Sequence, residues 1–188
     1  AIIVNIRILK LQDFLTKIYP PSETDDRVDA WFDENIYSTL DGAPKEILKF
    51  ENPDIYNDGG ALTANAGNQV VFRLADAILL YAEALADLGT NDGKACELLN
   101  RIRTRAGAST LSLSGDDLKD AIYWERVREL MGEGHYFYDL VRTGKVCDNN
   151  YCYHPITRSE FREGAWTWPI SKTAQENNTL ITLNNYWE

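Results

Sequence analysis

The sequence has few of the residues that enzymes and metal proteins commonly use for chemistry. Its 188 residues include two histidines, three cysteines and one methionine. Neither His135 nor His154 has a serine or cysteine placed as a nucleophile partner. Cys147, Cys152 and His154 make an incomplete ligand set, because a fourth ligand is missing and the spacing is not a zinc pattern. We therefore expect no catalytic residue, no metal ion and no cofactor.

Long apolar runs and an excess of basic residues are also lacking. No apolar run approaches the roughly 20 residues that a bilayer span needs. The 19 lysines and arginines stand against 29 aspartates and glutamates, which gives a net charge of −10. Because nucleic acid attracts surfaces rich in lysine and arginine, this balance excludes nucleic acid as the expected partner. The hydrophobic share of 44% is that of a folded domain with its own core.

The first residues suggest that this sequence is a fragment of a longer protein. It begins without methionine and inside an apolar segment, where apolar residues alternate from Ile2 to Ile8 as in a half-buried strand. Any export signal or lipid-attachment cysteine is therefore expected upstream. A short helix is predicted over residues 11–18, and Pro20 and Pro21 stop it.

Composition divides the sequence at about residue 70. From residue 22 to about residue 67 no hydrophobic period persists, and turn-forming residues dominate. A loop-rich stretch of this length is usually functional or mobile. We expect residues 1–69 to form a variable, loop-rich segment, and residues 70–188 to form a helical region that becomes irregular from Lys145 onward.

Helical periodicity begins after Val70. Two apolar stripes predict a helix that ends at Gly89 and packs against two neighbours. One stripe is large (Leu74, Ile78, Tyr81, Leu85, Leu88) and the other smaller (Ala75, Leu79, Ala82, Ala86). Asn91 or Asp92 caps a second helix that Gly107 closes, which gives an antiparallel hairpin.

A third helix and an aromatic segment follow the hairpin. The third helix is predicted to start between Ser114 and Asp117 and to include Leu130 and Met131, and residues 135–142 form a dense aromatic run. The expected fold is mainly α, with tetratricopeptide-like helical hairpins. Since a solenoid needs about three such units, the fold here is expected to be incomplete.

Charged residues on these helices predict a structural ion-pair network. Glu125 and Glu129 point toward the apolar side of the third helix, and a buried carboxylate is costly unless it is paired. Arg103 and Arg105 end the preceding helix and are available, and Glu83 is a further candidate member. A glycosidase acid/base pair is the less favoured alternative, because these carboxylates share one helix face and do not flank a substrate.

Ordered motifs connect the helical region to a known family. They are FRLADAILLYAEA at residues 72–84, LNRIRTRAG at 99–107, ERVREL at 125–130 and FYDLVRTG at 137–144, with WPI at 168–170 and NNTL at 177–180 in the tail. In order and spacing they resemble the C-terminal half of the SusD/RagB family. DDR at residues 25–27 resembles the DPR motif of that family's variable region.

The resemblance implies a function that composition does not reveal. Members of this family are nutrient-binding proteins, usually lipid-anchored on the cell-surface face of the outer membrane. They deliver glycans, or in some members peptides, to a TonB-dependent SusC-like transporter. We therefore expect a glycan-binding protein of polysaccharide utilization that is not an enzyme and whose anchor lies outside this fragment. A peptide-binding member of the family and a helical-repeat scaffold for protein partners are the alternatives.

The variable segment is the expected place for the ligand, because the helical motifs form the scaffold. Trp31, Phe32, Tyr37 and Tyr56 are the candidate stacking residues there. The alternative is that these aromatic side chains fill a minor core under the loops. A second open choice concerns Cys147 and Cys152, which could form a disulfide at the cell surface or remain free thiols.

Overall fold

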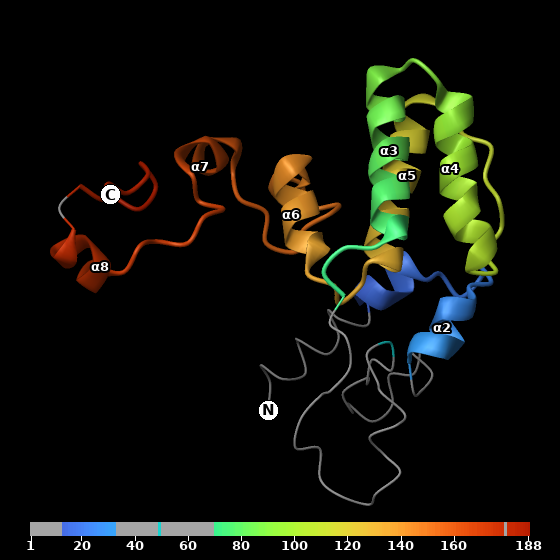
Figure 1. Ribbon diagram of the computed structural model, residues 1–188, viewed down its shortest axis with the longest axis horizontal. Coiled ribbons are helices and arrows are strands. Elements are labelled where there is room, and N and C mark those ends of the chain that lie inside the picture. Colours follow the sequence, from blue (N-terminus) through green and yellow to red (C-terminus); the bar gives the residue numbers. More distant parts are fainter. Residues whose placement is uncertain (1–12, 33–48, 50–69, 179) are drawn as a thin grey trace, which may run out of the picture. The chain divides into compact units, whose positions relative to one another are not determined.

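The regular elements in the part of the chain that the structure describes are helices. The structure is a computed structural model that describes residues 13–32, 49, 70–178 and 180–188 (Figure 1). The chain divides into two units, Ala1–Glu133 and Gly134–Glu188. This boundary lies away from residue 70, where the composition changes. The expected strand at residues 2–8 lies outside the described residues.

A helical hairpin forms the centre of the first unit. Helix α3 (Leu74–Leu88) ends at Gly89, whose φ of 61° is the left-handed conformation that glycine adopts readily. Helix α4 (Asp92–Arg105) begins after Asn91, whose side chain accepts a hydrogen bond from the Lys94 backbone N–H at 3.0 Å. The predicted hairpin is therefore confirmed, with Gly89 at the end of its first helix and Asn91 at the start of its second.

Helix α5 (Gly115–Glu129) packs against both helices of the hairpin (Figure 1). The core between them is apolar, and alanines on α3 and α4 let the helices approach closely. It contains Ala75, Ile78, Leu79, Ala82, Ala86, Ala95, Leu98, Leu99, Ile102, Leu118 and Ile122. The mainly α, tetratricopeptide-like arrangement is confirmed, although α5 ends at Glu129, before Leu130 and Met131.

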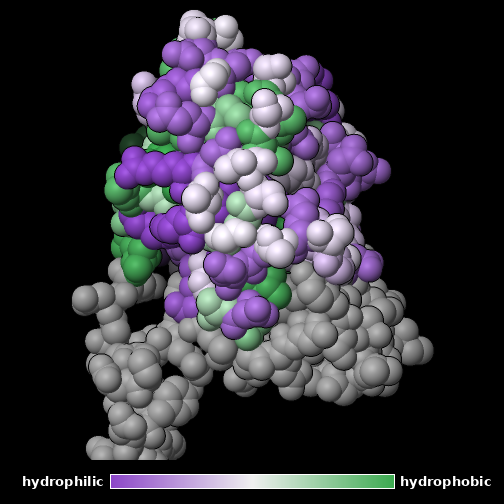
Figure 2. Space-filling view, turned by 90° about the vertical axis from the view of Figure 1, so that its right-hand side faces the viewer, coloured by the Kyte–Doolittle hydropathy of each residue, from purple (hydrophilic) through white to green (hydrophobic). Residues whose placement is uncertain are grey.

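The two apolar stripes of α3 differ in burial. The smaller-residue stripe is buried, because α4 and α5 both lie on its side of the helix. The larger stripe packs only in part: Ile78 and Leu85 contact the core, whereas Leu74, Tyr81 and Leu88 are 68%, 54% and 71% exposed. On the α4 side of the unit, Figure 2 shows mostly hydrophilic residues, with apolar ones in small patches and along one edge.

The short helix α2 (Asp26–Trp31) starts within the DDR motif and is hydrogen-bonded to the residue that follows α4. The Asp25 side chain caps α2 by accepting from the Arg27 backbone N–H, and the Asp26 N–H donates to the Ala106 carbonyl at 2.9 Å. A Cβ on Gly107 would collide with the Asp26 carboxylate, so this close approach requires glycine. The helix at residues 13–18 forms as predicted and buries Leu15 and Ile18.

The second unit contains four short helical elements. They are α6 (His135–Arg142), the 3₁₀ helix η3 (Lys145–Cys147), α7 (Arg158–Glu163) and α8 (Lys172–Asn177). The chain after Lys145, which was expected to be irregular, thus contains three short helical elements separated by non-helical segments. Thr157 and Glu160 form a reciprocal capping box at the start of α7, and Ser171 caps α8, so local side-chain hydrogen bonds define both helices.

Candidate functional site

Three glutamates spaced four residues apart organise one end of the first unit. Glu125 and Glu129 lie on α5, and Glu133 follows it in the turn. At the same end lie α2, the start of α3 and the end of α4 (Figure 1). Basic side chains from each of these elements pair with the three carboxylates.

Glu125 is completely buried and has three cationic partners. Its Oε1 lies 2.8 Å from Arg27 Nη2. Its Oε2 lies 3.0 Å from Arg103 Nη1 and 3.2 Å from Arg128 Nε. A buried carboxylate costs several kcal/mol unless it is paired, and cationic side chains lie beside both oxygens of Glu125.

Glu129 is also fully buried and joins three arginines. Arg27 Nη1 lies 3.0 Å from its Oε2, and Arg73 and Arg105 both contact its Oε1. Burial alone would raise the pKa of Glu129, but hydrogen bonds from Arg105 and Arg73 outweigh burial and hold this pKa below its ordinary value. Glu129 is therefore a permanent anion at neutral pH.

Glu133 binds Arg73 and Lys49, and Lys49 is the only residue between positions 32 and 70 that the structure describes. Arg73 Nε lies 2.8 Å from Glu133 Oε2, and Lys49 Nζ contacts Glu133 Oε1. Burial opposes ionisation of Glu133, yet the hydrogen bonds from Arg73 and Lys49 lower its pKa. Burial in turn lowers the pKa of Lys49.

The candidate stacking residues lie in contrasting surroundings. Trp31 ends α2 and is half-buried, with Lys49 Nζ 4.0 Å from its ring centroid. Phe32 is buried and makes an edge-to-face contact with Tyr19, with centroids 6.1 Å apart. Phe32 thus lies in a small core, and one face of Trp31 already holds a cation. Tyr37 and Tyr56 lie outside the described residues.

The structure brings together four of the five residues expected in the ion-pair network. Arg103 pairs with Glu125, and Arg105 pairs with Glu129. Glu83 is half-buried on α3, and its membership of the network stays a prediction. Five members of the network were not expected from the sequence: Arg27, Lys49, Arg73, Arg128 and Glu133. Arg27 lies in the DDR motif and Arg73 directly precedes a predicted helix, so the sequence offered a reason to consider both as members of the network.

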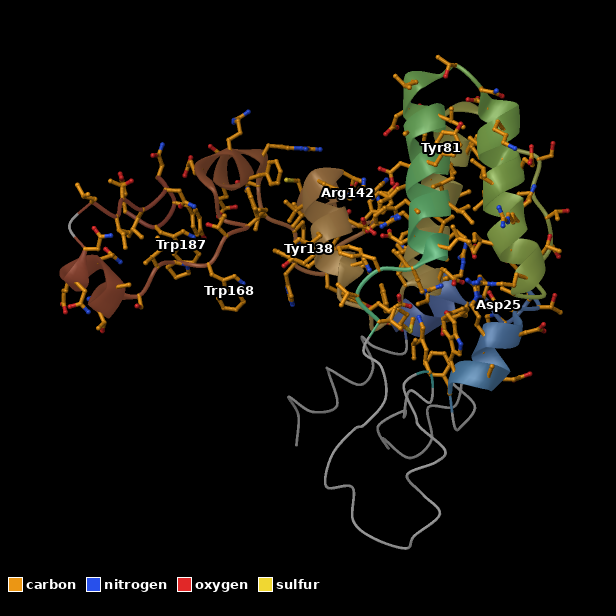
Figure 3. The ribbon with its side chains drawn as sticks, viewed as in Figure 1. Asp25, Tyr81, Tyr138, Arg142, Trp168 and Trp187 are labelled. Carbon is orange, nitrogen blue, oxygen red and sulfur yellow. The ribbon has the colours of Figure 1, made fainter. Side chains whose placement is uncertain are left out.

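The pairing of the three glutamates with arginines is suited to stabilising the fold rather than to acid/base catalysis. Each of the three carboxylates is engaged by at least one arginine, whereas a general acid needs a carboxyl that holds a proton near neutral pH. A separate buried pair, Arg126 with Asp76 at 2.8 Å, ties α5 to the first turn of α3. Asp25 lies where α2 meets the lower ends of α4 and α5 (Figure 3).

Among the described residues, the cysteine, histidine and acidic side chains form neither a metal site nor a disulfide. Within those residues, no group of three or more histidine, cysteine, aspartate or glutamate side chains is placed to hold a metal ion. Cys96, Cys147 and Cys152 are all free thiols, so the disulfide left open by the sequence is not formed. None of the described helices combines the length and the apolar character that crossing a membrane requires.

The second unit displays aromatic side chains to solvent. Trp168 is 90% exposed, and Tyr138, Tyr153 and Trp166 are also exposed. Figure 3 shows Trp168 on the chain between α7 and α8, and Tyr138 on α6. Other aromatic groups here are fixed by hydrogen bonds. Trp187 Nε1 donates to the Thr167 carbonyl at 3.1 Å, and Tyr136 donates to the Tyr151 carbonyl at 2.7 Å.

Comparison with known proteins accounts for the arrangement of helices and motifs. The model of the SusD family matches residues 45–187. The chain belongs to the SusD family. Proteins of this family are nutrient-binding proteins rather than enzymes.

Individual relatives agree with this assignment. The chain is 40% identical over 107 residues to SusD-like protein P25 of Formosa agariphila, covering 54% of this chain and 20% of the relative. It is 42% identical over 92 residues to SusD-like protein P38 of the same organism, covering 43% and 18%. The crystal structure of a SusD homologue from Bacteroides thetaiotaomicron is 61% identical with a TM-score of 0.85, covering 94% of this chain and 38% of that one.

These comparisons also show how much of a SusD-like protein is present. The chain spans about a fifth of the length of the two curated relatives and 38% of the solved homologue. Its fold matches that of the solved homologue over nearly all of its own residues. The comparisons thus identify the helical scaffold of the chain.

Proposed function

We propose that this chain is part of a cell-surface protein that binds oligosaccharides and passes them to a TonB-dependent SusC-like transporter. In this proposal the protein is lipid-anchored on the outer face of the outer membrane, through an anchor outside these residues. The observation that carries the proposal is the SusD family match over residues 45–187.

Two features of the residues support binding without turnover. The three glutamates that line one end of α5 are all engaged by arginines, so they are unsuited to protonating a glycosidic oxygen. Exposed aromatic rings such as Trp168 offer flat apolar planes, and the C–H faces of sugar rings pack well on such planes.

Calorimetric titration of the full-length protein with a panel of oligosaccharides tests the proposal. We expect saturable binding to at least one glycan, and no shortened products when the mixture is later separated by chromatography. Binding to a peptide panel alone would replace this proposal with the peptide-binding alternative. Hydrolysis products would overturn it, and binding to neither panel would favour a scaffold for protein partners.

Aromatic substitutions locate the binding surface. Trp31→Ala and Trp168→Ala each remove a candidate stacking plane, and loss of a central aromatic contact typically weakens binding by about tenfold or more. Tyr81→Ala is the matched control, because Tyr81 is an exposed aromatic residue on the scaffold helix α3. If Tyr81→Ala weakened binding as much as the two tryptophan substitutions, the ligand would lie on the scaffold.

A further inference from the structure

Trp168 combines an exposed ring with a fixed backbone. Its side chain projects from the chain between α7 and α8 and is 90% exposed (Figure 3). Trp166 and Ile170, on either side of it, are 40% and 41% exposed, so three large apolar side chains within five residues face solvent. Tryptophan is highly buried on average in folded proteins, because its large apolar ring gains most from leaving water. A strip of exposed apolar residues centred on a tryptophan is typical of a binding surface.

Hydrogen bonds from the end of the chain fix Thr167, the residue before Trp168. Trp187 Nε1 donates to the Thr167 carbonyl at 3.1 Å. Asn184 Nδ2 donates to the Thr167 hydroxyl at 2.6 Å and to the Gly164 carbonyl at 3.2 Å. The Thr167 hydroxyl and backbone N–H both donate to the same Gly164 carbonyl, at 2.8 Å and 3.0 Å. The backbone and the side chain of Thr167 are therefore held by residues 17 and 20 positions further along the chain.

The backbone that follows Trp168 is restrained as well. The ring of Pro169 fixes its own φ and confines the preceding residue to extended conformations. The Ile170 carbonyl accepts a hydrogen bond from Gln175 Nε2 at 2.7 Å, which ties it to α8. These restraints act on the residues on both sides of Trp168 and leave its ring in solvent. A side chain on a fixed backbone loses little conformational freedom when a ligand covers it, and such preorganisation favours binding.

Two other tryptophan rings are already covered by cations from within the protein. Lys49 Nζ lies 4.0 Å from the centroid of the Trp31 ring, and Lys17 Nζ lies 4.6 Å from the centroid of the Trp124 ring. At 90% exposure, Trp168 by contrast offers both faces of its ring to a ligand. The C–H face of a sugar ring packs on an aromatic plane of this kind.

The second unit carries almost no net charge. Residues 134–188 contain five lysines and arginines and six aspartates and glutamates, whereas the net charge of the whole chain is −10. A charged sugar or a basic peptide would be favoured by a surface rich in charges of the opposite sign. A flat apolar ring on a nearly neutral unit is better matched to an uncharged sugar.

We infer that Trp168 stacks on an uncharged pyranose ring and that Asn184 and Trp187 are positioning residues, which act by holding Thr167. This inference rests on the proposed function and deepens it, because it names the stacking residue, the class of sugar and the residues that fix the stacking plane. A protein that bound glycans through other residues would leave the proposed function intact.

Affinity electrophoresis of the full-length protein tests the role of Trp168. The gels contain arabinoxylan, galactomannan or mixed-linkage β-glucan as uncharged probes, and polygalacturonate as a charged probe. We expect at least one uncharged polymer to retard the protein and Trp168→Ala to weaken that binding about tenfold or more, since loss of a central aromatic contact has this effect. Trp168→Phe should retain most of the binding, because it keeps an apolar plane. Tyr138→Ala is the matched control, because Tyr138 is 72% exposed on α6.

The possible failures of this experiment can be told apart. Unchanged retardation of Trp168→Ala, or equal losses in Trp168→Ala and Tyr138→Ala, would overturn the stacking role while leaving glycan binding in place. Stronger retardation by polygalacturonate would overturn the class of sugar. Retardation by none of the four polymers would count against glycan binding itself, and the proposed function would fall with the inference. The urea midpoint of Trp168→Ala should be unchanged, and a lower midpoint would show that the ring packs within the protein.

Asn184→Ala tests the positioning role. It removes the amide that holds Thr167 and Gly164, so binding to the retarding polymer should weaken roughly threefold to tenfold, the effect of one or two hydrogen bonds. The same substitution in the Trp168→Ala protein, measured at higher polymer concentration, should cause no further loss, because Asn184 acts through Trp168. Trp187→Phe, which keeps a ring but removes the indole N–H, should behave in the same way. Equal losses in both backgrounds, or no loss in either, would overturn the positioning role.

Discussion

Different kinds of interaction stabilise each of the two units of the chain internally. In the first, long helices enclose an apolar core, and fully buried charges join residues far apart in the sequence. In the second unit, the buried side chains among the described residues are Asp139, Leu140 and Val146. The short helices α7 and α8 depend on capping hydrogen bonds from neighbouring residues. A scaffold stabilised by distant contacts unfolds cooperatively, whereas local caps permit segment-by-segment opening.

The difference shows what each unit depends on. Removing one partner of a buried charge cluster leaves uncompensated charges in a medium of low polarity. Removing one helix cap affects a single turn. Substitutions in the first unit should therefore change global stability, while equivalent substitutions in the second should be detected mainly near the altered residue.

The largest effect is expected from Glu125→Ala. It leaves Arg27 and Arg103, which are 4% and 2% exposed, without a carboxylate that both contact. The free energy of unfolding should fall by about 3–5 kcal/mol, measured by urea denaturation of the chain. The matched control is Glu97→Ala, which removes an exposed pair with Lys94 and should cost no more than about 0.5 kcal/mol. Equal effects of the two substitutions would refute the central role of buried charge.

Acid should weaken the first unit by a smaller amount, because protonation removes charge but keeps the side chains in place. The pKa values of Glu129 and Glu133 lie below the ordinary value of 4.5, so both groups stabilise the fold above that pH. This contribution is lost as the pH falls through their folded-state pKa values. Urea midpoints measured from pH 7 to pH 3 should decline below pH 4.5, and Glu133→Gln should show a shallower decline.

The sequence could predict those features that depend on neighbouring residues. The ends of α3 and α4 follow from Gly89 and Asn91, and Arg103 could be matched with Glu125 because their helices are adjacent in the chain. Arg27 and Glu129 are separated by 102 residues, so no local pattern connects them. The attachment of Lys49 to the end of α5 was hidden for the same reason.

The short helices of the tail were not predicted, for a different reason. The pattern of threonine followed three residues later by glutamate, at Thr157 and Glu160, is a recognised helix start, and it was overlooked because the surrounding hydrophobic period is weak. For the candidate ligand site, the sequence suggested Trp31 and Phe32 as stacking residues but could not reveal that a cation lies over the Trp31 ring and that Phe32 is buried.

Gly107→Ala tests the junction between α2 and α4 in the first unit. Alanine at a φ of 66° is strained, and its Cβ would also collide with the Asp26 carboxylate. The expected loss in the free energy of unfolding is about 2–3 kcal/mol. Gly89→Ala is the control, because Gly89 has a similar φ of 61° but open space around it, so strain alone should cost about 1 kcal/mol. If both substitutions cost the same, the contact with Asp26 contributes nothing.

The smallest effect is expected from Thr157→Ala in the second unit. The Thr157 hydroxyl accepts from the Glu160 N–H at 3.1 Å, and the Glu160 carboxylate accepts from the Thr157 N–H at 2.7 Å. Together they hold the first turn of α7, and hydrogen bonding to the Thr157 backbone and side chain lowers the pKa of the exposed Glu160 carboxyl. Loss of the hydroxyl should cost about 1 kcal/mol, measured as faster amide exchange in α7 with exchange in α3–α5 unchanged. Ser159→Ala, which lies within α7 but caps nothing, is the control. If exchange in α3–α5 rose as well, the second unit would be coupled to the global fold, and its caps would not act only locally.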